Sequence, residues 1–151
     1  MKRINLLISS SLISMAFLLL IVPQTIFPAG KKSDDKQQII RLEMKWLSSL
    51  HSKAGLDTIL APEFIHPIPQ GIFLTKDEHI NWAINHPDLS RNVQKFDTLF
   101  VRIYNNIGIA SGIVATYDHK GKIVRKSIFT DVFVKKSGKW HAVNAQENLI
   151  H

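Results

Sequence analysis

Asp131 and His66 are the two side chains whose types and surroundings best suit acid–base chemistry in this sequence. Asp131 stands in a run of aromatic and β-branched residues, where a carboxylate tends to have a raised pKa and can exchange protons near neutral pH. His66 precedes Pro67 in a segment that cannot be helical, where an imidazole could act as the second acid or base. The competing, commoner interpretation is that Asp131 only accepts hydrogen bonds in the core and that His66 has no chemical role.

Other kinds of reactive site have little support. The 151-residue chain has no cysteine, which excludes disulfides, thiolate zinc sites and cysteine nucleophiles. His79 and His86 are too far apart in the sequence to bind a metal from one helix face, and Ser111 and Ser127 lack the flanking glycines of a nucleophile elbow. We therefore expect neither a metal site nor another cofactor.

The neighbours of Asp131 follow from the pairing of two predicted strands. If Ser137 and Gly138 form a two-residue turn, Asp131 lies opposite Asn144, and Phe129 lies opposite Gln146. Asn144 and Gln146 would then flank Asp131 in a pocket. With the first helix included, the predicted ligand-binding residues are Trp46, Phe129, Phe133, Trp140, Asn144 and Gln146.

Three helical segments precede these strands. Apolar residues at three- and four-residue steps predict an amphipathic helix over residues 37–52. A short helical turn over 56–60 and an edge strand or extended loop over 64–69 follow. Thr75 and Glu78 have the spacing of a capping box, which predicts the start of a further helix.

The C-terminal half predicts four antiparallel strands, over residues 96–104, 107–118, 123–135 and 140–149. Asn-Asn, Lys-Gly and Ser-Gly pairs provide the turns between them. Helices that are separate from a run of strands indicate an α+β fold, with the helices on one face of a curved antiparallel sheet.

The first 30 residues are typical of an export signal. Lys2 and Arg3 precede an uncharged, mostly apolar run over residues 4–22, and Ala29 and Gly30 are candidate cleavage neighbours. Cleavage is the preferred interpretation, and a retained membrane anchor is the alternative, since the run is long enough to span a bilayer. Either outcome predicts a periplasmic or secreted domain over residues 37–151, after a linker over 31–36.

The net charge of +7 does not indicate nucleic-acid binding. Basic residues are scattered along the chain, whereas a nucleic-acid groove needs clustered charges interleaved with aromatic residues. We expect contact with a membrane only through the N-terminal segment, and only if that segment is not cleaved.

Several motifs together resemble the nuclear transport factor 2-like superfamily, in its SnoaL-like, ketosteroid-isomerase-like and uncharacterised bacterial branch. The resemblance covers residues 37–151, and its most specific part is the hairpin Gly138-Lys139-Trp140 with the acidic strand before it. It implies a cone-shaped fold with a pocket between a concave sheet and the helices, and frequent homodimers. The other motifs are Glu43-x-x-Trp46, Pro62-Glu63-Phe64-Ile65-His66, Pro69-Gln70-Gly71, Thr75-Lys76-x-Glu78 and Ile109-Ala110-Ser111-Gly112.

Since this fold hosts many activities, the resemblance does not select one. The leading hypothesis is a pocket that binds a small apolar or amphipathic molecule. One alternative is a lyase- or isomerase-type enzyme that uses Asp131 with His66 for proton transfer. Another is a dimeric assembly module without catalysis. We expect a homodimer through the sheet face that carries Val132, Val134 and Val143.

Overall fold

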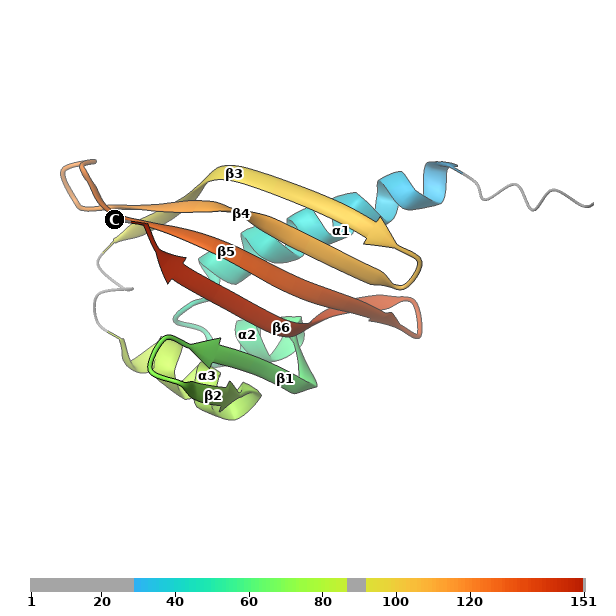
Figure 1. The fold of residues 1–151 in the computed structure, drawn as a ribbon, viewed down its shortest axis with the longest axis horizontal. Helices are drawn as coiled ribbons and strands as arrows, with labels where there is room; N and C mark the ends of the chain where they lie inside the picture. Colours follow the sequence, from blue (N-terminus) through green and yellow to red (C-terminus); the bar gives the residue numbers. More distant parts are fainter. Residues whose placement is uncertain (1–28, 87–91, 151) are drawn as a thin grey trace, which may run out of the picture.

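Three helices and one six-stranded sheet make up the part of the chain that this computed structural model describes, residues 29–86 and 92–150 (Figure 1). An α+β fold is therefore confirmed. The elements in chain order are α1 (Ala29–Ser48), α2 (Lys53–Ile59), β1 (Leu60–Ile68), β2 (Ile72–Thr75), α3 (Lys76–Asn85), β3 (Val93–Tyr104), β4 (Ile107–Tyr117), β5 (Ile123–Lys136) and β6 (Lys139–Leu149).

Helix α1 begins earlier than the apolar pattern predicts, so residues 31–36, the segment expected to be a linker, are helical. The side chain of Gln38 donates a 2.8 Å hydrogen bond to Asp34, one turn earlier. Asp35 is buried against the sheet, where it pairs with Lys135 and accepts a 3.1 Å hydrogen bond from the Trp140 indole. These long-range contacts extend the helix beyond its amphipathic part, and periodicity alone cannot reveal them.

Strand β1 is an interior strand and not the edge strand or loop that its prolines suggest. It pairs antiparallel with β2 on one side and parallel with β6 on the other. The pairing with β6 is irregular between Leu60 and Ile65, which leaves room for Pro62, a residue without an amide donor. The sheet is therefore mixed, in the order β2-β1-β6-β5-β4-β3.

The local signals for turns and caps are confirmed. The Thr75 and Glu78 side chains form a reciprocal capping box at the start of α3. Strands β3 to β6 form the predicted antiparallel meander. Asn105 and Ser137 have positive φ angles of 57° and 49° at their turns, and Gly138 follows with φ 81°.

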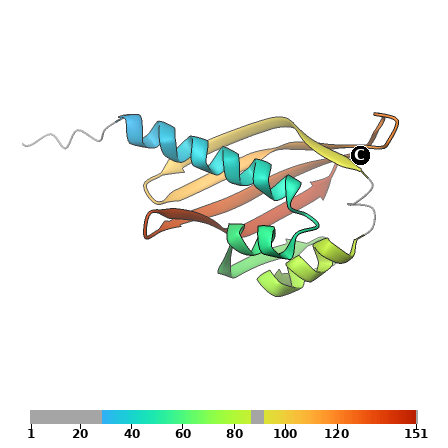
Figure 2. The ribbon, with the colours of Figure 1, turned by 180° about the vertical axis from the view of Figure 1, so that it is seen from behind.

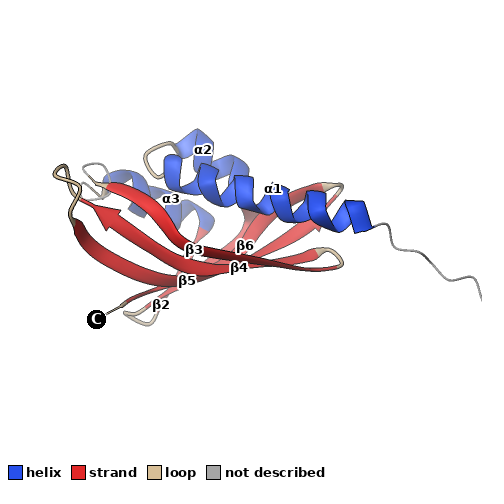
Figure 3. Ribbon diagram, turned by 90° about the horizontal axis from the view of Figure 1, so that it is seen from above, coloured by secondary structure: helices blue, strands red, loops and turns tan. Residues whose placement is uncertain are grey.

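All three helices cover the same face of the curved sheet (Figures 2 and 3). The core lies between the two layers, and its fully buried members include Ile39, Leu56, Phe64, Ile80 and Phe133. Among the described residues, the structure has no helix that is long and apolar enough to cross a membrane. The apolar run over residues 4–22 lies outside the described residues, whereas the candidate cleavage neighbours Ala29 and Gly30 are the first two residues of α1.

Candidate functional site

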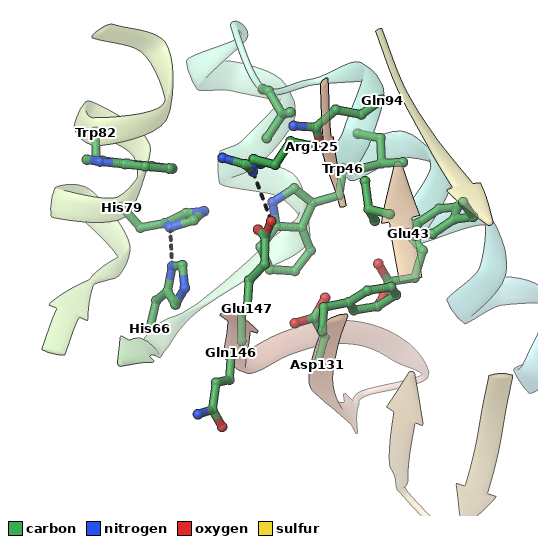
Figure 4. Close-up of a pocket in the computed structure, with 16 residues that line it drawn as sticks. Glu43, Trp46, His66, His79, Trp82, Gln94, Arg125, Asp131, Gln146 and Glu147 are labelled. Atoms are coloured by element: carbon green, nitrogen blue, oxygen red, sulfur yellow. Dashed lines mark hydrogen bonds and ion pairs between the residues drawn. The ribbon is translucent and has the colours of Figure 1, made fainter. Parts of the chain in front are cut away.

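A cavity of about 80 Å³ lies between the concave face of the sheet and the helices (Figure 4). Its walls are largely aromatic, and six ionisable side chains from five different elements face it. The aromatic residues are Trp46, Trp82, Phe96 and Phe129. The ionisable residues are Glu43, His66, His79, Arg125, Asp131 and Glu147.

Glu43 of α1 and Asp131 of β5 form a buried carboxyl pair, with exposed fractions of 2% and 8%. Their side chains are hydrogen-bonded to each other, which requires a proton between two carboxyl groups. Burial raises the pKa of Glu43 to about 8, against the opposing effect of the hydrogen bond from Asp131. Burial, then the charges of Glu43 and Glu147, raise the pKa of Asp131. The pair therefore keeps a proton at neutral pH.

Arg125 of β5 and Glu147 of β6 form an ion pair at the cavity, with 2.9 Å between Arg125 Nη2 and Glu147 Oε1. Both side chains are partly exposed, so this pair lies nearer to solvent than the carboxyl pair. The Nε atom of Arg125, by contrast, is buried and has no hydrogen-bond partner in the described part of the chain.

His66 of β1 and His79 of α3 are in contact through their Nδ1 atoms, 2.9 Å apart. Burial lowers the pKa of His66, and burial together with the nearby His66 lowers that of His79 to about 3. Both rings are therefore neutral at pH 7, and one of the two Nδ1 atoms donates to the other. The His79 ring also packs edge-on against Trp46 and stacks on Trp82, with centroids 5.9 Å and 6.1 Å away.

The fold of this chain is shared with many solved structures, although no family model and no curated protein matches its sequence. An NTF2-like (nuclear transport factor 2-like) protein from Cytophaga hutchinsonii aligns with a TM-score of 0.58 and 16% identity over 74% of this chain and 95% of that one. The chain has the nuclear transport factor 2-like fold. A candidate ketosteroid isomerase from Shewanella frigidimarina aligns with a TM-score of 0.60 and 14% identity over 72% and 92% of the two chains. The association domain of the C. elegans kinase CaMKII aligns with a TM-score of 0.65 and 16% identity over 78% and 98%.

Within this nuclear transport factor 2-like fold, four of the eight predicted site residues line the cavity with their side chains: Asp131, His66, Trp46 and Phe129. Two others lie elsewhere. Phe133 is fully buried in the core, and Trp140 packs against Asp35 near the β5–β6 turn. Phe133 and Trp140 lie on the same sheet face as Asp131, as predicted. The cavity, however, occupies only the part of that face that is farther from the β5–β6 turn.

The predicted positions of Asn144 and Gln146 are wrong by one residue. A β-bulge lies between the pairs Val132–Asn144 and Phe133–Ala142, so β6 contains one extra residue at this point. Asn144 consequently pairs with Val132, on the opposite face of the sheet from Asp131. The Gln146 side chain points away from the cavity (Figure 4), and only its backbone interacts with Asp131.

The same bulge brings Glu147 to the cavity, opposite Phe129 in the ladder. Sequence reasoning also missed Glu43, His79 and Arg125 as site residues. Glu43 had a recognisable signal, since it follows Ile39 by four residues and precedes Trp46 by three and therefore shares their buried helix face. His79 precedes the buried Ala83 by four residues and therefore shares its helix face, but its contact with His66 depends on the whole fold.

Proposed function

We propose that this protein binds a small apolar or amphipathic molecule in the cavity. The supporting observation concerns buried polar atoms without partners. Three such side-chain atoms occur among the described residues, Glu43 Oε1, His79 Nε2 and Arg125 Nε, and all three belong to residues that line this cavity. Buried polar groups are nearly always hydrogen-bonded in folded proteins, so a ligand that supplied their partners would be bound favourably.

The size of the cavity limits this molecule. A cavity of about 80 Å³ is well below the roughly 300–1,000 Å³ of pockets that enclose a drug-sized ligand. A molecule with a body of a few carbon atoms fits inside. A longer one would extend past Trp82, whose side chain is 37% exposed at the edge of the site.

Native mass spectrometry of the full-length protein, purified from cells, tests this proposal. We expect a bound small molecule on the wild type and on Asp97→Ala, a matched change at an exposed carboxylate of β3. We expect none on Asp131→Ala, with far-UV circular dichroism used to verify that this variant is folded. Equal retention by both variants would contradict the proposed site.

A second candidate function is proton transfer in a lyase- or isomerase-type reaction. It is supported by Glu43, whose pKa of about 8 lies near the pH at which a general acid or base works best. Asp131 shares its proton, and His66 is a neutral base on the same cavity. Deuterium uptake by a carbon atom of the bound molecule in D₂O, measured by NMR and lost in Asp131→Ala, would support this function.

We also propose that the domain is exported and dimeric. Export rests on the basic start and apolar run of residues 2–22. The dimer rests on the outer face of the sheet, where Val132, Val134 and Val143 are half-buried and Phe100 and Ile128 are exposed. The likeness to an association domain is compatible with this assembly. Assembly as the sole function is less favoured, because it predicts a filled core in place of a cavity.

A further inference from the structure

Acidic side chains outnumber basic ones around the cavity. The acidic groups are Glu43 of α1, Asp131 of β5 and Glu147 of β6, and the basic group among the described lining residues is Arg125 of β5. Arg125 is already paired with Glu147 at 2.9 Å. His66 of β1 and His79 of α3 add no charge at neutral pH, because burial lowers the pKa of both. Two carboxyl groups therefore remain without a compensating cation.

Aromatic faces surround these carboxyl groups. Trp46, Trp82, Phe96 and Phe129 line the same cavity as the carboxyl pair. Aromatic rings attract cations through the negative potential of their faces, most strongly when the cation is removed from water. An enclosure with both aromatic rings and excess carboxyl groups is better suited to an organic cation than to a neutral or anionic molecule.

The unpaired oxygen of Glu43 specifies the kind of cation. Glu43 is 2% exposed, and its Oε1 atom has no hydrogen-bond partner among the described residues. A primary or secondary ammonium group carries N–H donors for this oxygen, and charge-assisted hydrogen bonds of this kind are about twice as strong as neutral ones.

We propose that the cavity takes a small organic ammonium ion, with its N–H groups on the Glu43–Asp131 pair and its apolar body against Trp46 and Phe129. The inference rests on the proposed binding function and names its ligand class. On binding, the cation takes the place of the proton that the carboxyl pair holds, and that proton passes to solvent.

This exchange gives the affinity a distinctive pH dependence. An ammonium ion competes with the shared proton, so its binding becomes tighter as pH rises from 6 to 8.5, while the amine itself remains charged. A neutral molecule with a carbonyl group would instead accept the proton of the pair in a hydrogen bond, and its binding would weaken over the same range. The direction in which affinity changes with pH therefore distinguishes an ammonium ion from a neutral carbonyl compound.

Three molecules with the same branched body provide the test: isobutylammonium, isobutanol and isobutyrate. Indole N–H signals of the full-length protein, followed by NMR, report binding, because two of its three tryptophans line the cavity. Trp140 is an internal control, since its indole donates to Asp35 away from the cavity. We expect isobutylammonium to shift Trp46 and Trp82 but not Trp140, and to bind at least about tenfold more tightly than isobutanol.

Two variants sharpen the result. Glu43→Gln keeps the shape of the side chain and should weaken isobutylammonium binding by about tenfold or more. Glu63→Gln, a matched change at an exposed carboxylate that pairs with Lys136, should leave it unchanged. Equal binding of isobutanol, or tighter binding of isobutyrate, overturns the ammonium assignment while the pocket stands. If none of the three molecules shifts Trp46 or Trp82, both the assignment and the pocket proposal fail.

Discussion

Replacing Glu43 by Gln should stabilise the protein at neutral pH, although it alters a buried residue. The folded state raises the pKa of Glu43 from 4.5 to about 8, chiefly by burial. Between these two values, the folded chain holds a proton that the unfolded chain has lost. Stability must therefore fall as pH rises from 4.5 through 8.

The magnitude follows from the size of the pKa change. At about 1.4 kcal/mol per pKa unit, the raised pKa of Glu43 lowers the free energy of unfolding by about 3 kcal/mol at pH 7 and by up to about 5 kcal/mol above pH 8, relative to its value below pH 4.5. The glutamine side chain of the Glu43→Gln variant loses no proton, and its carbonyl oxygen can still accept a hydrogen bond from Asp131 as the Glu43 carboxyl does. The variant should accordingly match the wild type near pH 4 and exceed its stability by about 3 kcal/mol at pH 7.

Urea unfolding, followed by tryptophan fluorescence at several pH values from 4 to 8.5, measures this difference. The low pKa of His79 makes the wild type less stable as pH falls from 6.5 toward 3. That effect is present in both proteins and cancels in the comparison. Glu63→Gln, at the surface, should change stability by less than about 0.5 kcal/mol at every pH. A constant difference between wild type and Glu43→Gln, or a less stable variant at pH 8, would refute the buried protonated pair.

Three further predictions concern the scaffold, the assembly and the compartment. Gly112→Ala should lower stability by about 2 kcal/mol or more in thermal unfolding, because a Cβ atom there would lie 2.1 Å from the Thr98 carbonyl oxygen; an unchanged melting temperature would contradict this close approach. Light scattering should show a dimer at micromolar concentration, and a charge on the outer sheet face in Val134→Asp should convert it to a monomer; a monomeric wild type would exclude this interface. Cell fractionation should find the protein outside the cytoplasm, and a full-length soluble cytoplasmic form would count against export.

Features controlled by a few neighbouring residues were predictable from the sequence. The Thr75–Glu78 capping box depends on two side chains three residues apart, and the turns at Asn105 and Ser137 depend on the tolerance of those residues for positive φ. Asp131, His66 and Trp46 were correctly placed near one another through the family resemblance combined with the alternation of strand residues.

Features that depend on distant contacts were not predictable in this way. Nothing local to residues 60–68 indicates that they pair in parallel with β6, and the turn at Ser137 does not reveal the extra residue that β6 accommodates beyond Ala142. A single bulge reverses the facing of every later residue in that strand, which is why Glu147 replaces Asn144 in the site. Glu43 could have been predicted as a site residue, because its helical spacing from Ile39 and Trp46 places it on the buried face of the helix.

The parallel pairing of β1 with β6 has a consequence for biogenesis. During synthesis, residues 60–68 leave the ribosome long before residues 139–149. The backbone groups along one edge of β1 therefore remain unpaired until β6 has been synthesised. Six of the 16 residues that line the cavity, including Asp131 and Glu147, also come from β5 and β6, which are synthesised after the other strands. The sheet can thus be completed only after β6 (Lys139–Leu149) has been synthesised. A chain that is exported as we propose would therefore remain incompletely folded, and able to pass through a secretion channel, until that point.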